Sequence, residues 1–181
     1  MKIISIQTTT CTLRNLQERD AASFATLANN PNIAQNLRDY FPYPYTMLHA
    51  IDFIRMEMAR PMPMNLAIEV NGEAVGAIGI SPLSDVYRYG ADFGYWLGQP
   101  YWGKGIMTQA AKAMVNYVFH NFPLTRLQGS VFDFNEGSMK VLHNAGFQLE
   151  CIARDAVFKN GRQCNEHRFA LLKKDWMKLQ S

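Results

Sequence analysis

A chain of 181 residues, 48% of them hydrophobic, can bury a sizeable core and is short enough to form one globular domain, which we expect to span residues 1–181. Eighteen basic against fifteen acidic residues leave a net charge of +3, without a long run of Lys or Arg that would neutralise a row of phosphates. The charge therefore gives no reason to expect a nucleic-acid partner, whereas a small anionic ligand is compatible with it.

The three cysteines, Cys11, Cys151 and Cys164, are odd in number, and no two of them form a C-x-x-C pair. This pattern predicts neither a disulfide framework nor a zinc site, and it is typical of reduced thiols in the cytoplasm. The N-terminus has only a short apolar run, and no segment approaches the roughly 20 apolar residues of a membrane span. We therefore expect a cytoplasmic protein with no metal and no membrane partner.

The first third of the chain predicts one strand-like stretch followed by two helices. Residues 3–16 are rich in β-branched side chains, and residues 19–30 predict a helix with Asp20 as its N-cap. Residues 38–55 carry two prolines before a short helix that Thr46 can cap.

Three strands are predicted in the middle of the chain. LAIEV and EAVGAIGI flank Asn71-Gly72, a residue pair typical of a two-residue type I′ hairpin. ADFGYWL is the third strand, and it ends directly before the glycine-rich stretch GQPYWGKG, residues 98–105.

This glycine-rich stretch differs from a P-loop at its last position. The pattern G-x-x-x-x-G-K-[ST] ends on a hydroxyl that binds Mg²⁺, and Gly105 stands there instead. A helix from about Gly105 to His120, with an apolar stripe at four-residue spacing, would direct the N–H groups of residues 103–108 outward at the positive end of its dipole. Both a pyrophosphate site and a purely structural turn fit this pattern, whereas nucleotide hydrolysis does not.

The last third predicts a strand at TRLQGSVF, a short helix that opens at Asn135 and ends at Gly146, and two strands joined through Asn160-Gly161. In N-x-x-S, Asn135 and Ser138 fit capping residues better than ligand contacts when they are considered alone. The order of elements predicts an α/β fold with a mixed, largely antiparallel central sheet flanked by helices.

Four stretches in this order resemble the GNAT superfamily of acyl-CoA-dependent N-acetyltransferases, and within it the RimJ/RimL type that acetylates ribosomal-protein N-termini. They are TLRNLQERDAASFATLANNP, FPYPYT, ADFGYWLGQPYWGKGIMTQA and NEGSMKVLHNAGF. The resemblance implies a single GNAT-like domain, acetyl-CoA as co-substrate, no metal and a primary amine as acceptor, in a monomer or a homodimer.

The resemblance also implies roles for individual residues. In the family the glycine-loop amides bind the CoA pyrophosphate, the preceding strand pairs with the pantetheine arm, and the Asn of N-x-x-S contacts CoA. In this chain the roles fall on Trp102, Gly103, Lys104, Gly105, Ile106, Met107 and Thr108, on Tyr95, Trp96 and Leu97, and on Asn135. Trp102 stands where many members carry Gln or Arg, and Met107 where they carry Gly or Ala.

The chemistry implied is direct attack of a neutral amine on the thioester carbonyl, with oxyanion stabilisation by backbone N–H near Leu97. Leu142 stands where many members place a Tyr that protonates the leaving thiolate, so Ser138 becomes the candidate hydroxyl near the thiol. Asp92 is the candidate base, with an ordinary structural aspartate as the alternative.

The acceptor is the least defined part of the sequence. Four aromatic residues could wall its cleft, although such a cluster fits a core equally well: Tyr40, Phe41, Tyr43 and Tyr45. A protein N-terminal α-amine is favoured, and a polyamine, aminoglycoside or amino acid is the alternative. Met107 and the missing Tyr acid also motivate a catalytically weak acyl-CoA-binding module, while Gly105 argues against a P-loop phosphotransferase.

Overall fold

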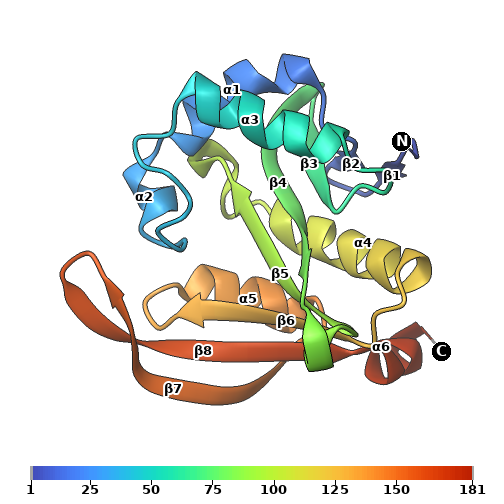
Figure 1. Ribbon diagram of the computed structural model, residues 1–181, viewed down its shortest axis with the longest axis vertical. Helices are drawn as coiled ribbons and strands as arrows, with labels where there is room; N and C mark the ends of the chain where they lie inside the picture. Colours follow the sequence, from blue (N-terminus) through green and yellow to red (C-terminus); the bar gives the residue numbers. More distant parts are fainter. Residues whose placement is uncertain (1, 181) are drawn as a thin grey trace. The chain divides into compact units, whose positions relative to one another are not determined.

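The computed structural model describes residues 2–180, which form two compact units (Figure 1). One unit comprises the chain up to Gly79 together with Tyr95–Ala113, and the other comprises Ile80–Gly94 and the chain from Met114 onward. Three elements contribute residues to both units: β4 (Glu73–Pro82), β5 (Gly90–Leu97) and α4 (Ile106–Asn121).

The strands follow the order β1-β2-β3-β4-β5-β6-β8-β7. Neighbours pair antiparallel at β1–β2, β2–β3, β3–β4, β6–β8 and β7–β8, whereas β5 and β6 are parallel. The predicted α/β fold with a mixed, largely antiparallel sheet and flanking helices is therefore confirmed. Between residues 2 and 180, no helix is long and apolar enough to cross a membrane.

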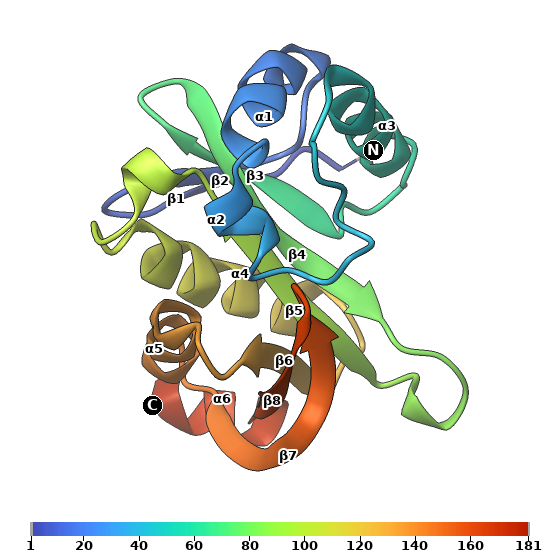
Figure 2. The same cartoon turned by 90° about the vertical axis from the view of Figure 1, so that its left-hand side faces the viewer.

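The first unit contains three short strands and three helices besides its shares of β4, β5 and α4. They are β1 (Ser5–Gln7), β2 (Thr12–Arg14), α1 (Ala21–Ala28), α2 (Pro31–Ala34), α3 (Met47–Met58) and β3 (Asn65–Val70). Helices α1 and α3 lie side by side (Figures 1 and 2). Their facing side chains form a core with the end of β5, in which Phe24 meets the Trp96 ring edge-on with centroids 4.9 Å apart.

Two predictions for this unit are confirmed by backbone geometry and capping bonds. The Thr46 hydroxyl accepts from His49 N at 3.4 Å at the start of α3. Asn71 and Gly72, with φ of +51° and +84°, join β3 to β4 in the left-handed conformation that a type I′ turn requires.

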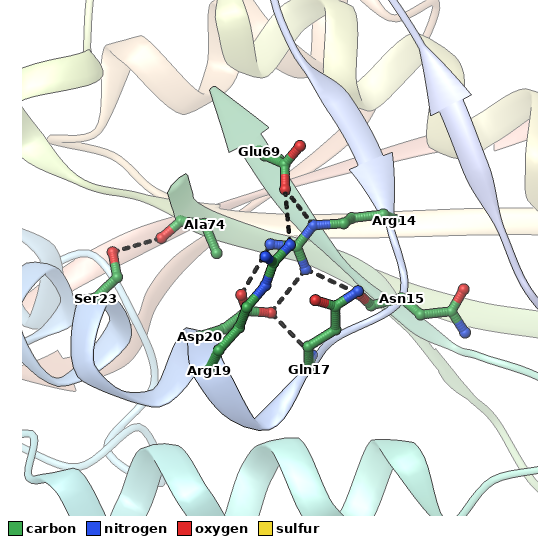
Figure 3. Close-up of polar contacts among 8 residues, drawn as sticks. All are labelled: Arg14, Asn15, Gln17, Arg19, Asp20, Ser23, Glu69 and Ala74. Atoms are coloured by element: carbon green, nitrogen blue, oxygen red, sulfur yellow. Dashed lines mark hydrogen bonds and ion pairs between the residues drawn. The ribbon is translucent and has the colours of Figure 1, made fainter. Parts of the chain in front are cut away.

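The predicted role of Asp20 is wrong in part. Asp20 occupies the N-cap position of α1, but its side chain makes no capping bond to that helix. Figure 3 shows why: both carboxylate oxygens accept from the Arg14 guanidinium at 2.8 Å, and Oδ2 also accepts from Gln17 N at 2.9 Å. Arg14 also pairs with Glu69 of β3, so the carboxylate of Asp20 completes a buried ion pair between strands and helix.

The second unit contains the other ends of β4, β5 and α4 and five further elements. They are β6 (Arg126–Phe132), α5 (Glu136–Asn144), β7 (Gln148–Lys159), β8 (Arg162–Leu172) and α6 (Lys173–Gln180). Helix α6 has no counterpart among the elements that the sequence predicted. Trp176 fixes this helix by donating from its indole N–H to Asn116 Oδ1 at 2.7 Å.

Helix α5 ends as its sequence predicts. Gly146 has φ of +97°, and Phe147, which is buried, donates from its backbone N–H to Leu142 O at 3.0 Å. Leu142 lies against β6, where a Cβ on Gly129 would stand 3.0 Å from Leu142 Cδ1. Because side chains alternate along a strand, α5 covers the face of β6 to which Gly129 belongs.

Candidate functional site

The loop between β5 and α4 is shaped to receive an anion. Gly103 and Gly105 have φ of +72° and +74°, and a Cβ at either position would have no neighbour within 4 Å. Helix α4 begins at Ile106, and the first backbone bond at its start runs from Gln109 N to Gly105 O at 3.1 Å. Within residues 2–180, no acceptor is recorded for the N–H groups of residues 103–108. Left-handed glycines and unpartnered amides at a helix N-terminus are features typical of backbone sites that bind anions.

Side chains outside the glycine motif hold the start of this loop. The amide groups of Asn30 and Asn32 donate to Gln99 Oε1 at 2.7 and 3.1 Å. The Tyr101 hydroxyl donates to Glu73 Oε2 at 3.2 Å, and this contact and burial raise the pKa of Tyr101, with burial the larger cause. The 3-10 turn at Gln99–Tyr101 is thereby tied to α2 and to the first residue of β4.

Trp102 closes the same turn with its backbone and with its ring. Its N–H donates to Gln99 O at 3.1 Å, so the unpartnered amides begin at Gly103 and not at Trp102. Its indole Nε1 donates to Leu97 O at 2.7 Å. The next side chain, Lys104, places its ammonium group 5.7 Å from the centroid of the Tyr101 ring.

The first turn of α4 can present only backbone to a ligand at two of its three positions. Ile106 and Met107 are buried, and Thr108 is half-buried. The Met107 side chain therefore packs inside the protein. Although Met is larger than the Gly or Ala of many family members, its backbone N–H stays at the start of the helix.

The end of β5 runs very close to β4. A Cβ on Gly76 would stand 2.4 Å from Trp96 O, and Gly98 N donates to Val75 O at 2.8 Å. The C=O of Trp96 and the N–H of Gly98 therefore face β4, and the backbone N–H and C=O of Leu97 point away from β4. Tyr95, two residues earlier, is half-buried.

The four predicted acceptor aromatics divide into two pairs. Tyr45 is buried, Phe41 stacks on it with centroids 5.1 Å apart, and both belong to the cluster that contains Trp96. Burial raises the pKa of Tyr45 to about 12. Tyr40 and Tyr43 are 82% and 54% exposed, so this pair offers more side-chain surface to a ligand than Phe41 or Tyr45 does.

In the second unit Asp92 sits at the end of a row of polar contacts. Gln128 Nε2 donates to Asp92 Oδ1 at 2.9 Å, and Arg126 Nε donates to Gln128 Oε1 at 3.4 Å. Arg126 also forms a bidentate pair with Glu150, which lowers the pKa of Glu150 chiefly through the hydrogen bond. The recorded β5–β6 pairing ends at Asp92–Gln128, so this carboxylate stands where the ladder stops.

The start of α5 holds the remaining two predicted residues. Asn135 Oδ1 accepts from Ser138 N at 3.1 Å, which confirms the capping role. Leu142 is buried against Gly129 of β6, so its side chain belongs to the core of this unit. Since Asp92 pairs with Gln128 while α5 covers the face of Gly129, Asp92 and α5 lie on opposite faces of the strands of this unit.

The structure thus joins predicted residues in three local groups, which are the loop with Leu97, the aromatic cluster with Trp96, and Asn135 with Ser138, and it holds Asp92 through Gln128. Sequence reasoning missed the residues that support them, above all Gln128 and Glu73. Their partners are set by strand register and by the turn at residues 99–101, which have no signature in a single sequence.

Comparison with known proteins gives a consistent result. Residues 11–148 match the model of an acetyltransferase (GNAT) domain. A probable N-acetyltransferase, YjcK, of Bacillus subtilis is 32% identical over 160 residues, with 81% of this chain and 88% of the relative covered. A putative ribosomal N-acetyltransferase, YdaF, of the same organism is 28% identical, with 91% and 92% covered.

A relative with a different acceptor is also similar. The spermidine N(1)-acetyltransferase of Escherichia coli is 26% identical, with 91% of this chain and 87% of the relative covered. Among solved structures, RimL, a ribosomal L7/L12 α-N-protein acetyltransferase in complex with coenzyme A, superposes with a TM-score of 0.81 at 22% identity, covering 94% of this chain and 98% of that one.

Proposed function

Because this chain belongs to the GNAT acetyltransferase family and is an acetyl-CoA-dependent N-acetyltransferase, we propose that it transfers the acetyl group to the α-amine of a protein N-terminus. The observation that carries the acetyl-CoA part of the proposal is the row of unpartnered N–H groups at residues 103–108, which suits the pyrophosphate of CoA. The family match spans residues of both units, which supports treating residues 1–181 as one functional domain.

In this proposal the loop amides from Gly103 to Thr108 bind the pyrophosphate, and the outward-facing N–H of Leu97 serves the pantetheine arm or the thioester oxygen. Tyr95 and Trp96 precede Leu97 at the end of β5, and their backbone belongs to the segment assigned to the pantetheine arm. Asn135 contributes to CoA binding through the part of its amide that does not cap α5, since Oδ1 already accepts from Ser138 N.

Asp92 and Ser138 supply the proton chemistry. The amine nitrogen attacks the thioester carbonyl, the C–N bond forms as the C–S bond breaks, and Asp92 or a water molecule takes the proton from nitrogen. Ser138 is the hydroxyl assigned to the departing thiolate. Asp92 and the helix that carries Ser138 lie on opposite faces of the strands of the second unit, which keeps the group assigned to the incoming amine apart from the group assigned to the departing thiolate.

The acceptor follows from the modest acid–base machinery. Leu142 is a core residue, so the Tyr acid of many relatives has no equivalent at this position. An α-amine with a reference pKa near 8 is about one-tenth neutral at pH 7, whereas a lysine near 10.4 is neutral in under about 0.1% of molecules. An α-amine therefore asks less of a base. The relative named as a putative ribosomal N-acetyltransferase supports this choice.

A small polyamine is the second candidate acceptor, and the similarity to a spermidine acetyltransferase favours it. Tyr40 and Tyr43 offer exposed rings that could bind either a cation or an N-terminal side chain.

The deciding experiment is an acetyl-CoA turnover assay, read by thiol release, against peptides, spermidine, aminoglycosides and free amino acids. Peptides with a free N-terminus should give the highest kcat/KM, and the same peptides with a blocked N-terminus serve as control. Faster turnover of spermidine would replace the first candidate by the second. CoA binding without thiol release from any amine would indicate a binding module that lacks catalysis.

A further inference from the structure

We propose that Trp102 is a positioning residue, which holds the glycine loop in its anion-binding shape by donating its indole N–H to the Leu97 carbonyl. This inference rests on the proposed pyrophosphate site. The bond is 2.7 Å long and joins the last residue of β5 to the residue before Gly103. A side chain thus fixes the start of the row of unpartnered amides.

The bond closes a turn that the backbone only partly defines. Tyr101 N donates to Gly98 O at 2.9 Å and Trp102 N donates to Gln99 O at 3.1 Å. After Trp102 no recorded backbone bond within residues 2–180 restrains the N–H groups until Gln109 N. The indole bond is therefore the last restraint before the six residues 103–108, whose conformation must match a ligand.

The hydrogen bond, more than the volume of the ring, distinguishes this tryptophan. Trp102 is 42% exposed, so much of its ring contributes no buried area. An anion site made of backbone amides loses affinity when its donors must be ordered on binding, because that entropy is then taken from the binding free energy. Because the indole bond holds Trp102 in place, less conformational entropy of the loop is lost when the anion binds.

A hydrogen-bond donor should therefore matter more at position 102 than an aromatic ring. Trp102→Phe keeps the ring and removes the donor, whereas Trp102→Gln removes the ring and keeps an N–H donor. The matched control is Trp176→Phe, which also removes an indole bond of 2.7 Å, to Asn116 in the second unit.

The experiment measures the Kd of CoA and of pantetheine, which lacks the pyrophosphate, by calorimetry for the folded wild type and the three variants. Trp102→Phe should weaken CoA binding about three- to tenfold, the range for one hydrogen bond, and should lower the ratio of CoA affinity to pantetheine affinity. Trp102→Gln should recover most of the CoA affinity, and Trp176→Phe should bind CoA as the wild type does.

Two results would overturn the inference: unchanged CoA affinity in Trp102→Phe, or equal losses in the Phe and Gln variants, which would indicate ring packing alone. Should Trp102→Phe be too unstable for calorimetry, amide exchange at residues 103–108 in Trp102→Gln and Trp102→Leu replaces it, and equal exchange in both would overturn the inference as well. A wild type that binds pantetheine and CoA equally would instead overturn the proposed pyrophosphate site.

Discussion

Gln128 holds one oxygen of Asp92 from the neighbouring strand, with Nε2 and Oδ1 2.9 Å apart. The orientation of the Gln128 amide is fixed because Arg126 Nε can only donate, and it faces Gln128 Oε1 at 3.4 Å. The amide nitrogen must then face Asp92. The hydrogen bond from Gln128 therefore fixes the orientation of the Asp92 carboxylate.

Replacing Asp92 by Asn should slow turnover and leave CoA binding nearly intact. The carboxamide keeps the size of the side chain but cannot accept a proton, so kcat should fall by about 10²-fold, the low end of general-base effects. Asp52→Asn, at an exposed position of α3, is the matched control. Steady-state kinetics and CoA titration measure both quantities, and an unchanged kcat would remove Asp92 from the mechanism.

Replacing Gly105 by Val should weaken acetyl-CoA binding by at least about tenfold, because donors to a charged acceptor contribute roughly 1.5–3 kcal/mol each. A Cβ at this position would meet no protein atom within 4 Å, so we expect the effect to fall on the ligand and on the backbone at φ of +74°. Gly161→Val is the control: φ is +78° there and the surroundings are equally open. Calorimetry should show weaker acetyl-CoA binding in Gly105→Val alone. If Gly105→Val binds acetyl-CoA as tightly as the wild type does, the proposed pyrophosphate site is wrong.

A peptide that carries both a free N-terminus and an internal lysine should be acetylated mainly at the N-terminus. The physical reason is the much larger neutral fraction of an α-amine at pH 7. Tandem mass spectrometry assigns the modified nitrogen, and the same peptide with an acetylated N-terminus gives the background rate at lysine. Modification mainly at lysine would contradict the proposal and point to a stronger base than Asp92.

Replacing Tyr45 by Phe should make the protein less sensitive to alkali. Burial raises the pKa of Tyr45 from 10.0 to about 12, so the stability contributed by its neutral form is complete below pH 10 and is lost as the pH rises through 12. Across that window the wild type should lose about 2 kcal/mol of unfolding free energy more than the variant. Denaturant titrations at several pH values measure this, with the exposed Tyr40→Phe as control. If the free energy of unfolding depends on pH in the same way for the wild type and Tyr45→Phe, burial of the phenol does not contribute to the alkali sensitivity.

The sequence predicts best where a local rule has no competitor. Asn71-Gly72 and Asn160-Gly161 both form the predicted turns, because few other residue pairs adopt two successive left-handed conformations at low cost. Asp20 shows the opposite case. Its capping role was predicted from local preference, but Arg14, six residues earlier, offers two charge-assisted bonds and draws the carboxylate away from the helix.

The candidate site follows the same division. The outward-facing amides of the loop were predictable, since the glycines of the motif and the start of the following helix indicate them. The roles of Gln128 and Glu73 were not, because both act across strands or turns. The sequence left Tyr45 between an acceptor cleft and the core, and its ring lies in the core; no periodicity in residues 38–45 separates buried from exposed aromatics.

The chain passes between its two units at residues 79–80, 94–95 and 113–114, and each passage lies inside β4, β5 or α4. Neither unit is a continuous piece of polypeptide. A single truncation or a protease cut in an exposed loop can therefore not release one unit intact, and an insertion at any passage would interrupt a strand or a helix. A segment exchanged with a relative should therefore be tolerated best when both of its ends fall within one unit. Neither unit can be exchanged as a single continuous segment.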